Sequence, residues 1–552
     1  MKINLIENGY EKQADLLKKI ISQRIQAEYE KEGLKIKLQI KSAIKKEDSY
    51  QISADGNGYT ITASDEAGLY YGIGKFLHTA KWSEKEFVPN PPLDMISPDC
   101  SFRAIYFSVH FNNWYDEAPT EELERYLEEL LLYGYNAIVC IIPIVSVDSF
   151  LDPLFTKSVA KIRSIFELAK HMGMKVGVII PPNQGMKTAP TEMYADLSFE
   201  PEDMVVRGTL GQNLCPSKPG VLEYMRDIWN TEFEQFKDIG LDYIIPWPYD
   251  EGGCGCSACR PWGAKGYCDL IKTMHDDAVK YYPKVRFILS TWLYDSPYDQ
   301  GEFSGLYERL ENDLKFVDYI MVDSHDQFPR YPLEHKKIKP IVNFPEISMW
   351  KLKPWGGRGA NPMPKRFQEI WDSAKQVLDG GMPYSEGMYE DILKIQCVGY
   401  YWDSESHYKE ILSEYINYEY SSEVCQEVLQ IMELIEENHV NVANSIEPNM
   451  EFANIAAKLA DEVEQKLSVR AKKSWRWRIL YIRAQIDKIL YQEYIERYMG
   501  KENTLFDLWH TPEEYLADSQ RAQDLMLELC ELYHCVEVDG VNWHTHPPVK
   551  SI

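Results

Sequence analysis

The hydrophobic and polar positions at the start of the chain predict a small α+β unit. An amphipathic pattern over 10–28 predicts a helix, and the run LKIKLQI at 34–40 predicts a strand. The segment 50–64 alternates apolar and polar residues on either side of a DGNG turn, which is typical of a β-hairpin. These elements together favour a helix packed on a short sheet.

A further helical segment carries three glycines, Gly68, Gly72 and Gly74. Glycine has no side chain, so this pattern predicts a helix that packs closely on the sheet. The proline-rich segment PNPPLDMISPD at 89–99 follows and indicates a boundary. We therefore expect an N-terminal α+β domain over residues 1–97.

The pattern changes from residue 98 to 403, where short apolar runs alternate with amphipathic segments. Nearly continuous apolar strands separated by helices indicate parallel βα units buried on both faces. Eight such units in about 300 residues favour a (β/α)8 TIM barrel of the α/β class. A doubly wound open sheet is the alternative, but no glycine-rich phosphate loop follows the first strand. The predicted strands are 102–109, 136–143, 175–182, 242–249, 286–293, 317–324, 339–346 and 381–386, and the clearest helices are 120–134, 159–173, 220–240 and 365–381.

Strand patterns end at about Asp403, and the remaining chain shows the helical period. We expect an all-α C-terminal domain over residues 404–552 that packs against the barrel. Four helical patterns support it, at 411–439, 451–474, 475–500 and 512–534.

Composition narrows the possible partners. The chain has 552 residues and a formal net charge of −27, which disfavours nucleic acid and anionic membrane surfaces as partners because both require clustered cations. No signal peptide or membrane-spanning stretch is recognised, and the 11 cysteines are typical of reduced thiols. We therefore expect a cytoplasmic protein; whether it forms a homo-oligomer is left open.

Catalytic groups of a barrel lie at the carboxyl ends of its strands and in the loops that follow. In this chain those positions are rich in carboxylates, amides and large aromatic side chains. Such groups suit the binding and cleavage of an oligosaccharide or glycoside, because aromatic faces stack on sugar rings and carboxylates act as acid, base or nucleophile. The candidate substrate-binding residues are His110, Asn112, Trp247, Tyr249, Trp292, Asp323, His325, Asn343, Glu346 and Tyr384.

Two glutamates are the main catalytic candidates. Glu251 follows the fourth predicted strand within YDEGG, and Glu386 follows the eighth within PYSEG. A retaining glycosidase needs two such carboxyl groups, one as acid/base and one as nucleophile. Asp250 and Glu346 are held in reserve. A single carboxylate at a strand end can also simply cap the next helix, so the argument depends on their number.

Other mechanisms stay open. Asp250 and Glu251 together would suit a substrate-assisted hexosaminidase, with Glu251 as acid and Asp250 orienting an acetamido group. An inverting hydrolase of the α-glucuronidase kind would use Glu251 as acid and Glu346 or Glu386 as base, with Arg330 or Arg358 meeting the uronate. A glycan-binding barrel without catalysis is the alternative of a different class.

A group of cysteines lies directly after the candidate acid. Cys254, Cys256, Cys259 and Cys268 could hold a structural zinc ion that braces the loop. Their spacing lacks the paired CxxC form, and buried reduced thiols are the simpler interpretation. We therefore expect no cofactor and no catalytic metal.

Three segments resemble known glycoside hydrolases. The segment DEAGLYYGIGKFL at 65–77 looks like the small domain that precedes the barrel in β-N-acetylhexosaminidases and α-glucuronidases. PWPYDEGG at 246–253 resembles the acid/base motif of α-N-acetylglucosaminidases, and the run from NFPEISMW at 343–350 to GGMPYSEGMYEDI at 380–392 resembles their late-barrel region. The resemblance implies Glu251 as acid/base, Glu386 as nucleophile, and a substrate containing N-acetylhexosamine or a related sugar.

Overall fold

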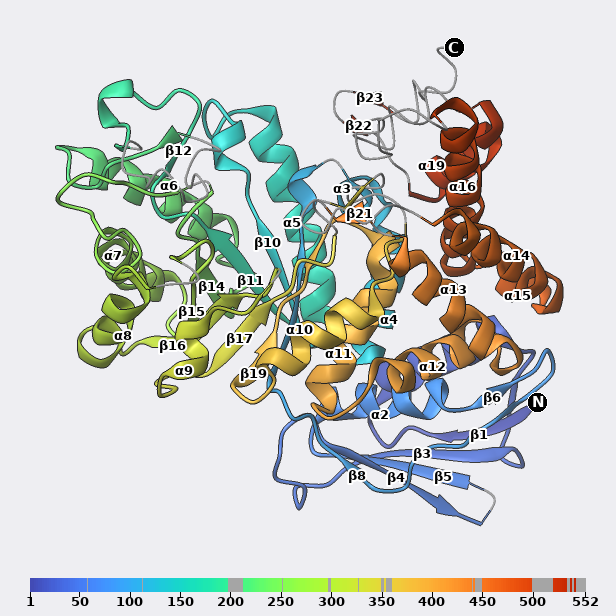
Figure 1. Ribbon diagram of the computed structural model, residues 1–552. Helices are drawn as coiled ribbons and strands as arrows, with labels where there is room; N and C mark the ends of the chain where they lie inside the picture. Colours follow the sequence, from blue (N-terminus) through green and yellow to red (C-terminus); the bar gives the residue numbers. More distant parts are fainter. Residues whose placement is uncertain are drawn as a thin grey trace.

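The structure is a computed structural model that shows an N-terminal sheet with two helices, a barrel and a helical C-terminal region (Figure 1). The N-terminal unit lies against one end of the barrel, and the C-terminal helices lie along its side. The described residues are 1–56, 58–111, 113–196, 212–250, 252–295, 299–325, 327–348, 352–353, 360–438, 440–441, 449–498, 520–533, 537–538 and 541–542.

The N-terminal unit is a six-stranded mixed sheet in the order β2-β1-β3-β5-β4-β8. Its central strand β3 buries Ile36 and Leu38 and turns the alternating lysines outward. The predicted hairpin is confirmed, since β4 and β5 pair antiparallel from Tyr50–Ala63 to Asp55–Gly58. The elements are β1 (Lys2–Ile6), α1 (Glu11–Arg24), β2 (Glu28–Tyr29), β3 (Leu34–Ile40), β4 (Tyr50–Asp55), β5 (Gly58–Ala63), α2 (Glu66–His78), β6 (Lys81–Trp82), β7 (Phe87–Val88) and β8 (Met95–Ile96).

One local prediction in this unit was wrong. The first helix ends at Arg24 rather than near residue 28, because Glu28–Tyr29 forms β2 and pairs with β1. Within the proline-rich segment predicted as a boundary, Met95–Ile96 adds β8 to the edge of the sheet beside β4.

Helix α2 is packed between the N-terminal sheet and the barrel (Figure 1). Asp65 caps its first turn by accepting a hydrogen bond from the amide of Gly68. A Cβ on Gly72 would lie 2.6 Å from Ile61 of β5, so this glycine allows close packing on the sheet as predicted. Gly74 instead faces the barrel, where a Cβ would lie 1.9 Å from the carbonyl oxygen of Leu132.

Eight parallel strands form the predicted closed barrel, in the order β10-β11-β14-β15-β16-β17-β19-β9, and a β9–β10 pairing closes it. The strands are buried on both faces, which explains their nearly continuous apolar sequences. The strands are β9 (Phe102–Phe107), β10 (Ala137–Ile141), β11 (Lys175–Ile180), β14 (Tyr243–Pro246), β15 (Arg286–Ser290), β16 (Val317–Asp323), β17 (Ile341–Phe344) and β19 (Leu378–Gly381). The helices associated with them are α3 (Trp114–Glu117), α4 (Thr120–Tyr133), α5 (Pro153–His171), α6 (Val221–Gln235), α7 (Gly266–Tyr281), α8 (Glu302–Asn312), α9 (Arg330–Glu334), α10 (Pro364–Ala374) and α11 (Asp391–Trp402).

The eighth strand begins earlier than predicted. The expected helix over 365–381 stops at Ala374, and the sequence LDGG that follows forms β19 between β17 and β9. The predicted run 381–386 supplies only the last residue of β19, followed by β20 (Tyr384–Ser385), which adds to β9 beyond it. Short pairs also form in the loops, β12 (Gln184–Gly185) with β13 (Gln212–Asn213) and β18 (Leu352–Lys353) with β21 (Val440–Asn441).

The C-terminal region is helical as predicted, although two of its helices are divided. The pattern over 411–439 is broken near Tyr420, and the pattern over 451–474 is broken at Leu467. Residues 512–519 lie outside the described residues, and the domain bounds given above stay predictions. The elements are α12 (Tyr408–Glu419), α13 (Cys425–Glu437), α14 (Met450–Lys466), α15 (Val469–Lys472), α16 (Trp475–Tyr498), α19 (Gln523–Tyr533), β22 (Glu537–Val538) and β23 (Val541–Asn542).

Among the helices in the described part of the chain, none combines the length and the apolar character needed to cross a bilayer.

Candidate active site

Aromatic side chains gather inside the barrel toward the carboxyl ends of its strands. Phe344 lies 5.1 Å from Trp247 and 5.5 Å from Trp292, measured between ring centres, in edge-to-face contacts. Tyr106 and Tyr384 make a similar contact at 5.2 Å. These rings come from the ends of β9, β14, β15, β17 and β20, and they form an apolar floor of the kind that stacks on sugar faces.

The Asp250 carboxyl group lies beside this floor. Trp292 donates a hydrogen bond from its indole Nε1 to Asp250 Oδ2 at 2.6 Å, so the two loops after β14 and β15 are joined there. Burial raises the pKa of Asp250, and the Trp292 hydrogen bond lowers it in part. Asp250 and Leu293 have φ of 68° and 56°, a left-handed conformation that costs free energy in residues other than glycine. Such strain is common in loops that hold functional groups.

Glu346 and Glu386 lie at neighbouring strand ends and affect each other electrostatically. Burial raises the pKa of Glu346 well above its ordinary value, and the negative charges of Glu386 and Glu390 raise it further. The Ser348 hydroxyl and amide donate to Glu346 Oε1. Tyr384 donates its hydroxyl to Glu386 Oε1 at 2.9 Å, which orients that carboxylate. The structure therefore places a buried carboxyl group with a raised pKa near a second carboxyl group that accepts a hydrogen bond from a tyrosine.

Glu390 contacts the backbone of Glu386 and helps to hold it in place. Its carboxylate accepts hydrogen bonds from the Ser385 hydroxyl and from the Glu386 amide, the latter at 3.0 Å. Burial raises the pKa of Glu390 to about 8, and the neighbouring Lys394 lowers it in part. The Lys394 ammonium group donates to the carbonyl oxygen of Gly387. These contacts fix the backbone on both sides of Glu386.

Two histidines and an aspartate also lie in the described part of the barrel mouth, the end formed by the carboxyl ends of the strands. His110 stacks on Tyr106 with ring centres 6.3 Å apart, and burial lowers the pKa of His110 to about 3, so its imidazole is neutral. Asp323 ends β16 and accepts a hydrogen bond from the His325 amide at 2.8 Å. Arg366 of α10 donates to the His325 carbonyl oxygen and brings a cation to this edge.

Two predicted substrate contacts lie elsewhere. Tyr249 is fully buried outside the barrel interior and donates its hydroxyl to Glu302 of α8. Asn343 accepts a hydrogen bond from the Tyr401 hydroxyl at 2.9 Å, in the layer between β17 and α11. Both side chains hold the wall of the barrel, so the prediction that they contact substrate is corrected. The neighbouring Phe344 faces inward instead, as the alternation of a strand requires.

Some predicted residues cannot be placed. Glu251, Asn112 and Arg358 lie outside the described residues, so their predicted roles stay predictions. Arg330 begins α9 and is exposed.

The cysteine group differs from the prediction in one member. Cys254, Cys256 and Cys259 converge with Cys215, which precedes α6 and was not predicted. Cys268 is not part of this group, because its thiol lies in α7 and donates to a backbone carbonyl oxygen 3.1 Å away. Sequence spacing favoured Cys268 because it is near in the chain, whereas Cys215 is near only in space.

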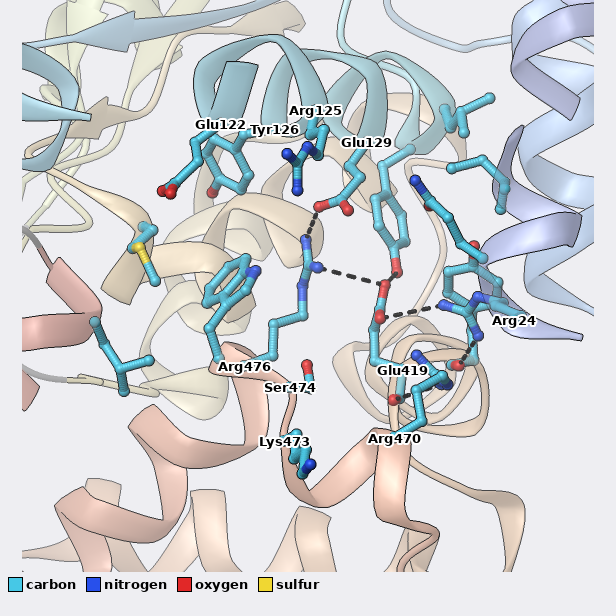
Figure 2. Close-up of a pocket in the computed structure, with 18 of the residues that line it drawn as sticks. Arg24, Glu122, Arg125, Tyr126, Glu129, Glu419, Arg470, Lys473, Ser474 and Arg476 are labelled. Carbon is cyan, nitrogen blue, oxygen red and sulfur yellow. Dashed lines mark hydrogen bonds and ion pairs between the residues drawn. The ribbon is translucent and has the colours of Figure 1, made fainter. Parts of the chain in front are cut away.

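A cavity of about 720 Å³ lies away from this site, between α1, α4, α16 and the end of α12 (Figure 2). Figure 2 shows Arg476 at its centre, with ion pairs to Glu129 at 2.7 Å and to Glu419 at 3.8 Å. Arg24 bonds the same Glu419 and lies over the ring of Tyr418 at 3.5 Å. None of the described candidate residues lines this cavity. Ion pairs connect Arg24 and Arg476 through Glu419, and the residues that line the cavity come from all three parts of the chain.

The sequence comparisons match one part of the chain. Residues 2–88 match the model of glycosyl hydrolase family 20, domain 2. The search of curated proteins finds no match.

Similar solved structures cover most of the chain at low identity. A GH115 4-O-methyl-α-glucuronidase with specificity for decorated arabinogalactans has a TM-score of 0.61 and 12% identity, over 99% of this chain and 77% of that one. A GH89 enzyme from Clostridium perfringens, in complex with GlcNAc-α-1,4-galactose, has a TM-score of 0.62 and 10% identity, over 88% and 62%. A GH138 enzyme targeting pectin rhamnogalacturonan II has a TM-score of 0.54 and 11% identity, over 96% and 74%. These likenesses establish the fold that the chain shares with them.

Proposed function

We propose that this protein is a glycoside hydrolase that cleaves glycans containing N-acetylhexosamine or a related sugar. The observation that carries the proposal is the pair Glu346 and Glu386 beside an aromatic floor at the mouth of a closed barrel. Carboxyl groups held next to stacking faces are the groups that glycosidic bond cleavage needs. The domain match and the glycoside hydrolase names of the similar structures support the same class.

The proposed mechanism is retaining. Glu386 acts as the nucleophile at the anomeric carbon, while Glu251 protonates the leaving oxygen and later activates water. The Tyr384 hydroxyl orients Glu386, and the Glu390 contacts to the Glu386 amide hold its backbone. Asp250, fixed by Trp292, lies in the loop that carries Glu251 and orients either that loop or an acetamido group.

Glu346 is the basis of a second mechanism. Burial and the nearby carboxylates raise its pKa well above the ordinary value, which suits a proton donor or a hydrogen-bond donor to the sugar. If Glu346 rather than Glu386 reacts with the sugar, Glu346→Gln should lower kcat more than Glu386→Gln does. The inverting alternative, with Glu346 or Glu386 as base, predicts a product of inverted anomeric configuration.

The first experiment is a panel of nitrophenyl glycosides of GlcNAc, GalNAc, glucose, galactose and glucuronate in both anomers. Hydrolysis of one anomer of an N-acetylhexosaminide is the expected result. Saturable binding without any hydrolysis across the panel would indicate the glycan-binding alternative and would contradict the enzyme.

The second experiment assigns the roles. Glu251→Gln is expected to lower kcat by about 10²–10⁴-fold, the range for loss of an acid/base group, and Glu386→Gln by several orders of magnitude. Neither change should move the thermal midpoint much, since glutamine has the same shape. The exposed Glu405→Gln is the control and should leave kcat unchanged. Azide should restore the turnover of the Glu386→Ala enzyme and yield a glycosyl azide of inverted anomeric configuration. If azide restored the turnover of Glu346→Ala alone, Glu346 rather than Glu386 would be the nucleophile.

A further inference from the structure

Four cysteine sulphur atoms converge beside the loop that follows β14. The Sγ atoms of Cys215, Cys254, Cys256 and Cys259 all lie within 4.8 Å of one another, and Cys215 and Cys256 are 3.7 Å apart. Three of these side chains are buried and Cys256 is half-buried. Thiols in an ordinary core are dispersed among carbon atoms, so four sulphurs around one point require a specific explanation.

The convergence is set by the backbone of two separate segments. Cys215 follows β13 and donates its amide to the Met193 carbonyl oxygen at 2.9 Å. The other three lie in the loop after β14, where the Cys259 amide donates to the Cys256 carbonyl oxygen at 2.9 Å and closes a turn. The two segments therefore present their thiols to each other without any disulfide, and all four are free.

The geometry matches one metal in particular. Zinc with four thiolates is tetrahedral with Zn–S of about 2.3 Å, which places the sulphurs about 3.8 Å apart. The 3.7 Å between Cys215 and Cys256 agrees with that spacing, whereas a disulfide would need about 2.05 Å. Closed sets of four thiolates are structural sites, since no coordination position is open for a substrate.

We propose that Cys215, Cys254, Cys256 and Cys259 bind one zinc ion as four thiolates and thereby join the loop after β14 to the segment after β13. Each thiol loses its proton when it binds the metal, so loading releases up to four protons and gives a zinc–tetrathiolate site with a net charge of −2. A tetrahedral set of four thiolates suits zinc or iron, and we choose zinc because structural sites with four cysteines commonly hold it.

The zinc site would support the loop that carries Asp250. Asn183, at the end of β11, already bridges the same two segments, because its side-chain amide donates to Leu214 O at 2.8 Å and to Gly253 O at 2.9 Å. Cys215 and Cys254 are each one residue further along these two segments. A zinc ion bound here would hold the two segments together next to the point where Asn183 bridges them.

The test begins with the full-length protein purified without chelators. Elemental analysis is expected to give about one zinc per chain. Replacement of the metal by Co²⁺ should give sulphur-to-cobalt charge-transfer bands and the visible bands of a tetrahedral tetrathiolate. Iron in place of zinc would overturn the choice of metal, and disulfides among these four cysteines or a chain that binds neither zinc nor Co²⁺ would overturn the site.

The variants separate the four ligands from their neighbours. Cys215→Ser and Cys254→Ser should each lose most of the zinc, whereas Cys268→Ser should keep it, because Cys268 lies outside the group. Equal zinc retention in Cys215→Ser and Cys268→Ser would overturn the assignment. If a ligand variant does not fold, the release of zinc from the wild-type protein by a thiol-blocking mercurial gives the same answer. These readouts do not use hydrolysis, so they are independent of the proposed function.

Discussion

At the scale of single residues, neighbouring glutamates at the mouth of the barrel raise the pKa of Glu346. Glu346 is buried near Glu386 and Glu390, and each additional negative charge there raises its pKa. Burial and like charge thus favour the neutral form of Glu346 beside a second carboxyl group. Two carboxyl groups whose environments separate their pKa values are the arrangement that acid–base chemistry uses.

His110 gives a prediction about pH. Burial lowers its pKa to about 3, whereas an unfolded histidine has a pKa of about 6.5. Below pH 6.5 the unfolded chain takes up a proton that the folded chain does not, so the contribution of His110 to stability is lost as the pH falls toward 3. His110→Gln should remove up to about 1.4 kcal/mol per pH unit from the fall in unfolding free energy.

The measurement is urea unfolding of both proteins at several pH values between 4 and 7. The exposed His171→Gln is the control for the loss of a histidine at the surface. Equal slopes for His110→Gln and the wild type would show that folding does not lower the pKa of His110.

The sequence could predict which positions end strands, but only partly where their side chains point. Trp247 and Trp292 follow the ends of β14 and β15 and lie among the inner aromatic rings, since strand ends are recognisable from apolar runs, while their contact with substrate stays a prediction. Asn343 is one residue from the inward-facing Phe344, and a shift of one residue reverses the face of a strand. Cys215 could not be chosen over Cys268 because nothing in the sequence brings residue 215 near residue 254.

At the scale of elements, the end of the barrel shows where local patterns fail. The segment after α10 reads as a helix because its apolar residues continue the helical period, yet LDGG forms β19. Gly381 must be a glycine for a reason that is only visible in space, since a Cβ there would lie 1.9 Å from Asn343 Oδ1. Pairing with β9 and β17 overrides the local preference and closes the barrel.

Gly74 gives a prediction at this scale. A Cβ at this position would overlap the Leu132 carbonyl oxygen of α4, so Gly74→Ala should push α2 away from the barrel and cost about 1–3 kcal/mol. In an open helix the same change gains about 1 kcal/mol, so the sign of the effect tests the packing.

Chemical unfolding of the wild type and of Gly74→Ala measures this change in unfolding free energy. Gly173→Ala is a comparison without overlap, because it meets no atom within 4 Å and pays only for its left-handed φ of 83°. A stabilised Gly74→Ala protein would mean that α2 and α4 are further apart than described.

At the scale of the whole molecule, buried ion pairs connect the three parts of the chain. Arg476 of α16 bonds Asp391 of α11 at 2.7 Å and Glu129 of α4 at 2.7 Å, and it is 6% exposed. The net charge of −27 therefore does not lie entirely at the surface or at the mouth. Some of the acidic side chains are buried and paired with Arg476 at the junction of the barrel with the helical region.

Removal of Arg476 should lower the stability of the folded protein. Arg476→Met leaves buried carboxylates without a counter-charge and is expected to lower the unfolding free energy by about 3–5 kcal/mol. Lys375→Met, which breaks a pair with the exposed Glu405, should cost less than about 1 kcal/mol. Urea unfolding of both variants checks the difference, and equal losses would show that the buried pairs add nothing.

The contact between Arg24 and Tyr418 also has a consequence in time. Arg24 donates to the Tyr418 carbonyl oxygen, 394 residues later in the chain. At about 5–20 residues per second, a ribosome needs roughly 20–80 s to make the intervening chain. For the later part of that interval, once Met95–Ile96 has been made, α1 and its sheet are complete but lack the partner that covers Arg24. The N-terminal unit must therefore persist alone before the helices made last dock on it and complete the molecule.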